Sequence, residues 1–175
     1  MLGLTTATAA RAQEPTRTPV PYEQVLSASP ILWMFKWYNL DYERKINTVA
    51  TWGVSGSYLE PGDSSYGRAT VLVRYYPQGA ALSGFYLGGQ LGVYHTVYTD
   101  YDYPSSYPSS TGPTGQRRCE SMSGAGIDLG YAWVMGARRN FSMSLGFGVS
   151  RLFGSHADDL PAMPNVRLFN VGYAF

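Results

Sequence analysis

The sequence has few charged residues, one cysteine and no long hydrophobic run, and each shortage argues against a class of protein. Charged residues make up 14% of the chain, whereas ordinary soluble domains contain about 25%. Cys119 is the single cysteine, so neither an intramolecular disulfide nor a multi-cysteine metal site can form. No run approaches the roughly 18 apolar residues that a membrane-spanning helix needs. The net charge of +1, without a basic stripe, gives no electrostatic basis for binding nucleic acid.

What the chain does contain is alternation, and residues 141–153 (FSMSLGFGVSRLF) show it most clearly. From Phe141 to Ser150, large apolar side chains occupy one parity, and Ser and Gly occupy the other, which predicts a β-strand with two different faces. A soluble sheet normally turns Lys, Glu, Thr or Arg to water. Small residues instead suit the crowded interior of a narrow barrel, and the large apolar face then points to lipid. The pattern therefore predicts a transmembrane strand.

The same reading along the chain predicts one all-β domain. Eight candidate strands cover residues 23–33, 37–45, 49–59, 68–76, 85–98, 118–135, 141–153 and 166–175. The connections after the second, fourth and sixth strands are short or medium, and those after the third, fifth and seventh are longer and more polar, which is the arrangement of an outer-membrane barrel. Closure leaves no lipid-exposed hydrogen-bonding edge. We therefore predict a closed eight-stranded antiparallel transmembrane β-barrel over residues 23–175.

The segment before the barrel divides into two parts. Residues 1–12 (MLGLTTATAARA) end in an A-x-A pattern, which indicates the remnant of a signal peptide cleaved near Ala12; a disordered N-terminus is the alternative. Residues 13–22 are rich in proline and predict an extended lead-in. The first strand alternates poorly, and Pro30 suggests a bulge or a strand end within it.

The last strand carries a resemblance to a known group of proteins. FNVGYAF places Phe169, Val171, Tyr173 and Phe175 on one parity, and it is similar to the C-terminal signal of bacterial outer-membrane proteins. LDYERK (40–45), VRYYPQG (73–79), GFYLGGQLGVY (84–94) and GIDLGYAWVMG (126–136) extend the resemblance. Together they resemble the small eight-stranded barrels of the OmpA, OmpX and opacity-protein type. The resemblance implies a Gram-negative outer membrane, a lipid environment, and recognition of the terminal strand by the barrel-assembly machinery.

Four ionisable residues lie on the inward parity of their strands: Asp41, Glu43, Arg74 and Asp128. We expect Arg74 and Glu43 to meet near the rim that carries the short turns. Ion pairs in a narrow lumen fill space and neutralise charges that burial would otherwise leave alone. We therefore interpret the group as a plug, because eight strands enclose room only for side chains; the alternative is a gate that meters a pore.

Aromatic residues suggest two further surfaces. Trp33, Trp37, Trp52 and Trp133 are predicted to form girdles at the membrane interfaces. The polar segment 100–116, which contains Tyr101, Tyr103 and Tyr107, is the candidate surface loop, because tyrosine is favoured where proteins meet partners. The tyrosines nearest the strand ends could instead extend the girdle.

The two histidines are the residues to consider for enzymatic activity. Some small outer-membrane barrels modify lipid A with a histidine, a serine and a carboxylate, but His95 lies on an outward parity with no serine two residues on. His156 lies in a loop beside Asp158 and Asp159, a cluster that more often is solvated than metal-bound. We assign no catalytic residue, metal or cofactor.

The sequence thus predicts a monomeric, non-enzymatic barrel with a structural or adhesive role, a plugged lumen, and loops 100–116 and 154–165 outside. The alternatives are a lipid A-modifying enzyme, a narrow solute pore, and a soluble lipocalin-like carrier. The carrier would require the opposite parity, with the large apolar side chains lining a cavity.

Overall fold

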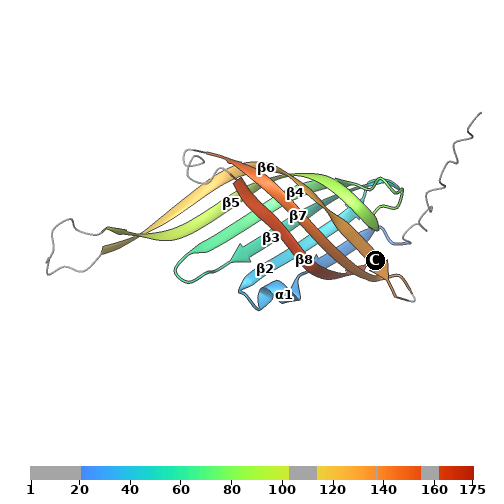
Figure 1. Cartoon of the computed structure of the whole chain (residues 1–175), viewed down its shortest axis with the longest axis horizontal. Helices are drawn as coiled ribbons and strands as arrows, with labels where there is room; N and C mark the ends of the chain where they lie inside the picture. The colour runs from blue at the N-terminus through green and yellow to red at the C-terminus, as the bar shows by residue number, and fades with distance from the viewer. Residues whose placement is uncertain (1–20, 103–113, 137, 155–161) are drawn as a thin grey trace, which may run out of the picture.

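The computed structural model describes residues 21–102, 114–136, 138–154 and 162–175, and these form a closed antiparallel barrel in sequential strand order (Figure 1). The predicted signal-peptide remnant and nearly all of the lead-in lie outside the described residues. The elements are β1 (Gln24–Ala28), α1 (Pro30–Trp33), β2 (Trp37–Lys45), β3 (Ala50–Leu59), β4 (Ser65–Tyr75), β5 (Gly84–Asp102), β6 (Thr114–Met135), β7 (Phe141–Phe153) and β8 (Ala162–Ala174). The predicted fold class is confirmed.

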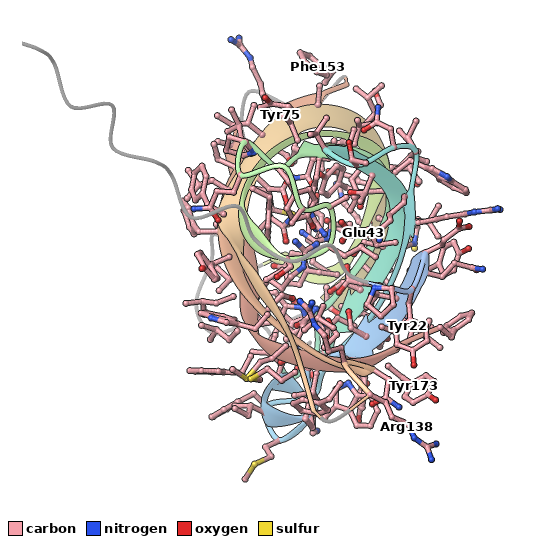
Figure 2. The ribbon with its side chains drawn as sticks, turned by 90° about the vertical axis from the view of Figure 1, so that its right-hand side faces the viewer. Tyr22, Glu43, Tyr75, Arg138, Phe153 and Tyr173 are labelled. Carbon is pink, nitrogen blue, oxygen red and sulfur yellow. The ribbon has the colours of Figure 1, made fainter. Side chains whose placement is uncertain are left out.

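The two faces of the wall follow the predicted parity. Figure 2 looks into the barrel from the end that carries the short turns, with Glu43 inside the ring and Tyr75, Phe153 and Tyr173 pointing outward. In β2, Leu40 is 55% exposed, whereas Asp41 beside it is buried. Because the interior is polar and the exterior apolar, the inverted arrangement that a soluble carrier needs is not found. The exterior is suited to lipid, and the fold is a transmembrane barrel.

The prediction for the first strand is wrong in its second half. β1 ends at Ala28, Ser29 precedes a short helix in an extended conformation, and Pro30 occupies the first turn of α1. Proline is accepted there because the first N–H groups of a helix have no partner within the helix. The first strand is therefore five residues long, and α1 packs against β2 and β8 where the strand would have continued.

The β5–β6 hairpin is longer than predicted. The β5–β6 pairing runs out to Asp102 opposite Thr114, whereas β4 reaches only Val97 of β5 and β7 reaches only Ser123 of β6. The outer part of the hairpin is thus a two-stranded ribbon that extends beyond the wall (Figure 1). β4 and β8 also start three and four residues earlier than predicted, at Ser65 and Ala162.

Candidate functional site

The candidate site is an ion-pair network inside the barrel, built from strands that are distant in sequence. Arg74 of β4 lies between two carboxylates: its Nη1 donates to Oε2 of Glu43 on β2, and its Nε lies 3.1 Å from Oδ2 of Asp128 on β6. Arg74 and Asp128 are 4% and 3% exposed. The structure thus places three of the four sequence-derived plug residues in direct contact.

Arg167 of β8 extends this network to the fourth residue. Its Nη1 lies 3.2 Å from the same Oδ2 of Asp128, and its Nη2 lies 3.2 Å from Oδ1 of Asp41. The result is a continuous chain in the order Glu43, Arg74, Asp128, Arg167 and Asp41. Three carboxylates and two guanidinium groups alternate in it, so every charge lies beside at least one of opposite sign, as buried charges require.

Neutral side chains add hydrogen bonds to this network, in which Arg74 Nη2 and Asp128 Oδ1 have no partner among the described residues. Glu43 Oε1 accepts from Thr51 Oγ1 at 2.6 Å and from Tyr76 Oη at 2.7 Å. Asp41 Oδ2 accepts from Asn170 Nδ2 at 2.5 Å. The ring of Tyr86 lies under the Arg74 guanidinium, 4.5 Å from centroid to Cζ, and its hydroxyl accepts from Arg167 at 3.2 Å. We call these residues together the ion network.

Sequence reasoning missed Arg167, because a bulge changes the parity of β8. Ser144 pairs with Asn170, but Gly146 pairs with Arg167, so β8 has one extra residue at Leu168 and Phe169. Phe169 has a φ of 46°, and both bulge residues are exposed on the outer face. Arg167 shares the sequence parity of outward-facing Phe169 yet lies buried in the lumen. The signal available in the sequence was a charged residue at a position where the alternation predicts an outward-facing apolar side chain.

Glycines let the large lumen side chains approach the wall. Tyr86 is fully buried, and its hydroxyl would lie 2.4 Å from a Cβ at Gly130 and 2.3 Å from one at Gly146. Any larger residue at these two positions would collide with the ring. The small-residue face predicted from the sequence is therefore the surface on which Tyr86 rests.

A second barrier closes the lumen toward the short turns. The connection between β4 and β5 folds inward, so that Ala80, Ala81 and Leu82 are buried. Leu82 packs with Val25 and Val134 of the wall, and Ala81 N–H donates to Thr48 O at 2.8 Å. We call the part of the lumen that contains this cap and the ion network the inner half.

The other part of the lumen, the outer half, has a different character. Gln90 bridges Ser150 at 2.8 Å and Asn165 at 3.0 Å, and Tyr94 packs with Met122 and Leu152. Beyond them lies a cavity of about 210 Å³ that Arg68 helps to line.

The predicted girdle residues do not all face lipid. Trp33 and Trp52 are exposed on the exterior, and Trp133 packs at a tilt beside Tyr131, with 4.6 Å between ring centroids. Trp37 corrects the prediction, because it lies at the lumen mouth, where its Nε1 donates to Ser57 Oγ at 2.7 Å. It has the inward parity of β2, which was the signal that the girdle interpretation overlooked.

Comparison with known proteins places the chain in a family. Residues 23–156 match the model of a family described as protein of unknown function (DUF3575). The chain belongs to this family. No curated protein matches the chain.

Two solved structures have folds similar to that of this chain. One is the N-terminal β-barrel domain of Pseudomonas aeruginosa OprF, with 12% identity, a TM-score of 0.47, and coverage of 87% of this chain and 94% of the other. The second is the Yersinia pestis outer membrane protein Ail in a phospholipid bilayer nanodisc, with 17% identity, a TM-score of 0.48, and coverage of 88% and 99%.

The terminal strand of this DUF3575 member closes the barrel against the first strand. Gln24 N–H donates to Phe175 O at 3.0 Å, and Phe175 N–H donates to Gln24 O at 2.9 Å. Phe169, Tyr173 and Phe175 are exposed on the exterior, and Val171 is half-buried. The aromatic residues of the proposed assembly signal therefore point away from the lumen.

The remaining candidates fall partly outside the described residues. Tyr103, Tyr107, His156, Asp158 and Asp159 lie outside them, and only the backbone of Tyr101 is described, within β5. Among the described residues, no group of three or more His, Cys, Asp or Glu side chains could hold a metal ion. In the same part of the chain, no helix is long and apolar enough to cross a membrane.

His95 has a serine partner that the sequence did not indicate. Its Nδ1 lies 2.9 Å from Oγ of Ser121 on the neighbouring strand, since His95 and Ser121 face each other in the β5–β6 register. The pair is exposed. A search along one strand for the serine could not find it, because the partner is 26 residues away in sequence.

Proposed function

We propose that the protein is a non-conducting, non-enzymatic barrel of the bacterial outer membrane that holds the β5–β6 hairpin outside the cell for contact with other surfaces. In this arrangement the short turns and both ends of the barrel sequence face the periplasm. The role is structural and adhesive, and it uses no cofactor or metal. The barrel acts as a monomer that the barrel-assembly machinery inserts.

The observation that carries this proposal is the length of the hairpin. From Tyr98 opposite Arg118 to Asp102 opposite Thr114, the two strands pair only with each other. An isolated two-stranded ribbon is marginally stable in water, and it presents two free hydrogen-bonding edges that can pair with another chain. Residues 115–119 are exposed. Extending the hairpin beyond the wall costs stability, and contact between the hairpin and a partner would explain why the protein has this extension.

The closed inner half of the lumen supports a role that does not involve transport. A solute would have to separate Arg74 and Arg167 from three carboxylates and also displace the cap at Ala80–Leu82. Breaking one buried ion pair costs about 3–5 kcal/mol. We therefore expect no conductance steps when the purified protein is inserted in a planar bilayer, and regular steps would contradict the closed state.

Topology is tested with the native cysteine, which is exposed on the hairpin. A membrane-impermeant maleimide applied to intact cells should label Cys119 if the hairpin lies outside, and Cys119→Ser is the matched control without a thiol. Labelling only after the outer membrane is permeabilised would place the hairpin in the periplasm and overturn the proposed orientation.

The adhesive role is tested by shortening the hairpin. Residues 99–117 are replaced by Asn-Gly, which joins Tyr98 to Arg118 through a two-residue turn. The control replaces residues 77–79 in the β4–β5 connection with Gly and Ser. Both variants should keep a heat-dependent shift in gel mobility, but only the shortened hairpin should abolish retention of expressing cells on glass and their aggregation. Unchanged retention would contradict adhesion through this hairpin.

The His95–Ser121 pair supports a second candidate function, hydrolysis of an ester at the membrane interface. A serine beside a histidine is the core of an acyl-transfer site. Among the described residues, however, no hydrogen bond joins a carboxylate to His95, so the group that would orient the ring is not found there. Mass analysis of lipid A decides between the two: the proposal predicts identical lipid A from cells with wild-type protein and cells with Ser121→Ala, whereas a deacylated species lost in Ser121→Ala would establish the enzyme.

A further inference from the structure

The cavity in the outer half of the lumen is independent of the hairpin and of the ion network. Its volume is about 210 Å³, and an engineered apolar cavity of about 150 Å³ is large enough to bind benzene. Its lining is mainly apolar and comes from four strands. The principal side chains are Trp37, Leu59, Tyr66, Arg68, Met163 and Pro164.

Arg68 gives this apolar cavity a positive charge that forms no ion pair with a carboxylate among the described residues. It is the only charged residue in the lining that the described residues supply. Within the described part of the chain, Arg68 makes no hydrogen bond or ion pair, and its buried Nε has no acceptor. Arg74 and Arg167, by contrast, each contact two carboxylates. A cation in apolar surroundings is unfavourable unless an anion accompanies it, so the cavity is complementary to an acidic ligand.

The short first strand leaves a seam between β2 and β8 beside the cavity, which α1 and Ser29 cover instead of a strand. β1 pairs with β8 only as far as Ala28 opposite Val171, so the described part of β8 from Ala162 to Asn170 has no strand partner on that side. Ser29 partly spans this seam, since its N–H donates to Asn39 Oδ1 and its hydroxyl donates to Leu168 O. Beyond Ser29, Trp37 on β2 and Pro164 on β8 line the cavity from the two sides of the seam.

Pro164 fits the unpaired edge of β8. Proline has no N–H to donate, and within sheets it is confined to edges, strand starts and bulges. In α1 and the turn after it, Trp33, Met34 and Phe35 are exposed beside the same seam. The seam is therefore bordered by apolar side chains rather than by a row of charges, so an apolar chain that approached it from the bilayer would meet no charged barrier there.

We propose that this cavity binds an amphiphile with one carboxylate head group and an apolar tail. The carboxylate pairs with the Arg68 guanidinium, and the tail packs against Trp37, Leu59 and Met163. The ion network below prevents the ligand from crossing the barrel, so the cavity holds its ligand and does not conduct it. This binding site does not depend on the adhesive role of the hairpin.

The experiment uses the whole barrel in lipid nanodiscs and follows ¹⁵N resonances during titration with octanoate. The indole N–H of Trp37, which donates to Ser57, and the Nε–H of Arg68 report directly on the cavity. Both should shift and saturate with octanoate, whereas octylammonium, which has the same tail and the opposite charge, should shift neither. Arg68→Gln should weaken octanoate binding about tenfold or more, the loss of one charge-assisted contact.

Two variants control for unspecific effects. Arg44→Gln removes an exposed arginine on the outer face of β2 and should leave the octanoate affinity unchanged. Met163→Trp fills the cavity and should abolish the Trp37 response, with the heat-dependent gel shift confirming that the barrel is closed. Equal responses to octanoate and octylammonium, or an unchanged affinity in Arg68→Gln, would overturn the proposal; a shift that never saturates would do so too, because it indicates partition into the bilayer.

The source of the ligand is distinguished by how it is delivered. Octanoate reaches the cavity from water, whereas palmitate incorporated in the nanodisc lipid reaches it only through the seam. A Trp37 shift with both ligands supports binding of a membrane-derived fatty acid, with the longer tail lying in the bilayer. A shift with octanoate alone supports binding of a water-soluble monocarboxylate in the same cavity.

Discussion

The two halves of the lumen are built from the same strands, but their arginine side chains have opposite surroundings. In the inner half, Arg74 and Arg167 alternate with three carboxylates, and the β4–β5 connection caps the end. In the outer half, Arg68 faces apolar side chains and a cavity. Arg68 and Arg74 lie on the same face of β4, six residues apart. The surroundings that the neighbouring strands supply, and not the residue type, therefore decide whether an arginine in the lumen closes the barrel or remains available to a ligand.

The largest effect is expected at Asp128, which joins the two arginines of the ion network. Asp128→Ala leaves both guanidinium groups with one carboxylate fewer, so the free energy of unfolding should fall by about 3–5 kcal/mol. Urea unfolding in lipid vesicles, followed by tryptophan fluorescence, measures the loss. Glu60→Gln at an exposed site is the control. A loss below about 1 kcal/mol would show that the network does not stabilise the barrel.

The second-largest loss of stability is expected for a charge placed on the outer surface at the level of the ion network. Leu145 is exposed beside Gly146, which pairs with Arg167. Leu145→Arg places a charge at the same level but on the lipid side, and it should cost about 2–4 kcal/mol at the bilayer midplane. Ser144→Ala should cost little in the same unfolding assay. If the two variants were equally stable, the assignment of this face to lipid would be wrong.

A smaller effect is expected where Tyr86 rests on the wall. Gly146→Ala forces the Tyr86 hydroxyl to move, because the new Cβ would lie 2.3 Å from it, and such overpacking costs about 1–3 kcal/mol. Gly56→Ala is the matched control, since nothing lies within 4 Å of its added Cβ. Equal stability of the two variants would indicate that Tyr86 is not held between Arg74, Arg167 and the wall.

The smallest effect on stability is expected at Arg68. Because Arg68→Gln breaks no ion pair among the described residues and removes a charge from apolar surroundings, the free energy of unfolding should not fall by more than about 0.5 kcal/mol. Arg74→Gln, compared in the same assay, should approach the loss at Asp128. A large loss in Arg68→Gln would mean that the two halves of the lumen do not differ as described.

Alternation in the sequence sufficed for most of the wall. β2 and β7 have the predicted bounds, because inward polar or small residues and outward apolar residues alternate through most of their length. The same rule placed Asp41, Glu43, Arg74 and Asp128 in the lumen. It did not find Arg167, because the extra residue at Leu168 and Phe169 is invisible to a strict two-residue period.

Other features could not be predicted for local physical reasons. The outer parts of β5 and β6 extend beyond their pairing with β4 and β7, and their sequence is polar at both parities, so it resembles a loop. The end of β1 depends on the local choice between strand and helix at Pro30, and the alternation of the preceding residues is too weak to decide it. The cavity at Arg68 depends on side chains from four strands, a juxtaposition that the register and the short first strand create together.

The brevity of β1 has a consequence for the order in which the barrel forms. β1 and β8 come from opposite ends of the sequence, and their register contains four residue pairs, Val25–Ala28 against Val171–Ala174, continued by the two backbone hydrogen bonds between Gln24 and Phe175. Joining them closes the longest loop in the chain, an entropic cost that those few backbone contacts must offset. Asn170 and Arg167 of β8 both contact Asp41, so they add side-chain links from β8 to β2, the strand beside β1. We therefore expect the pairing of β1 with β8 to form last during insertion. In the folded barrel, its amide hydrogens should exchange faster than those of the other strand pairings.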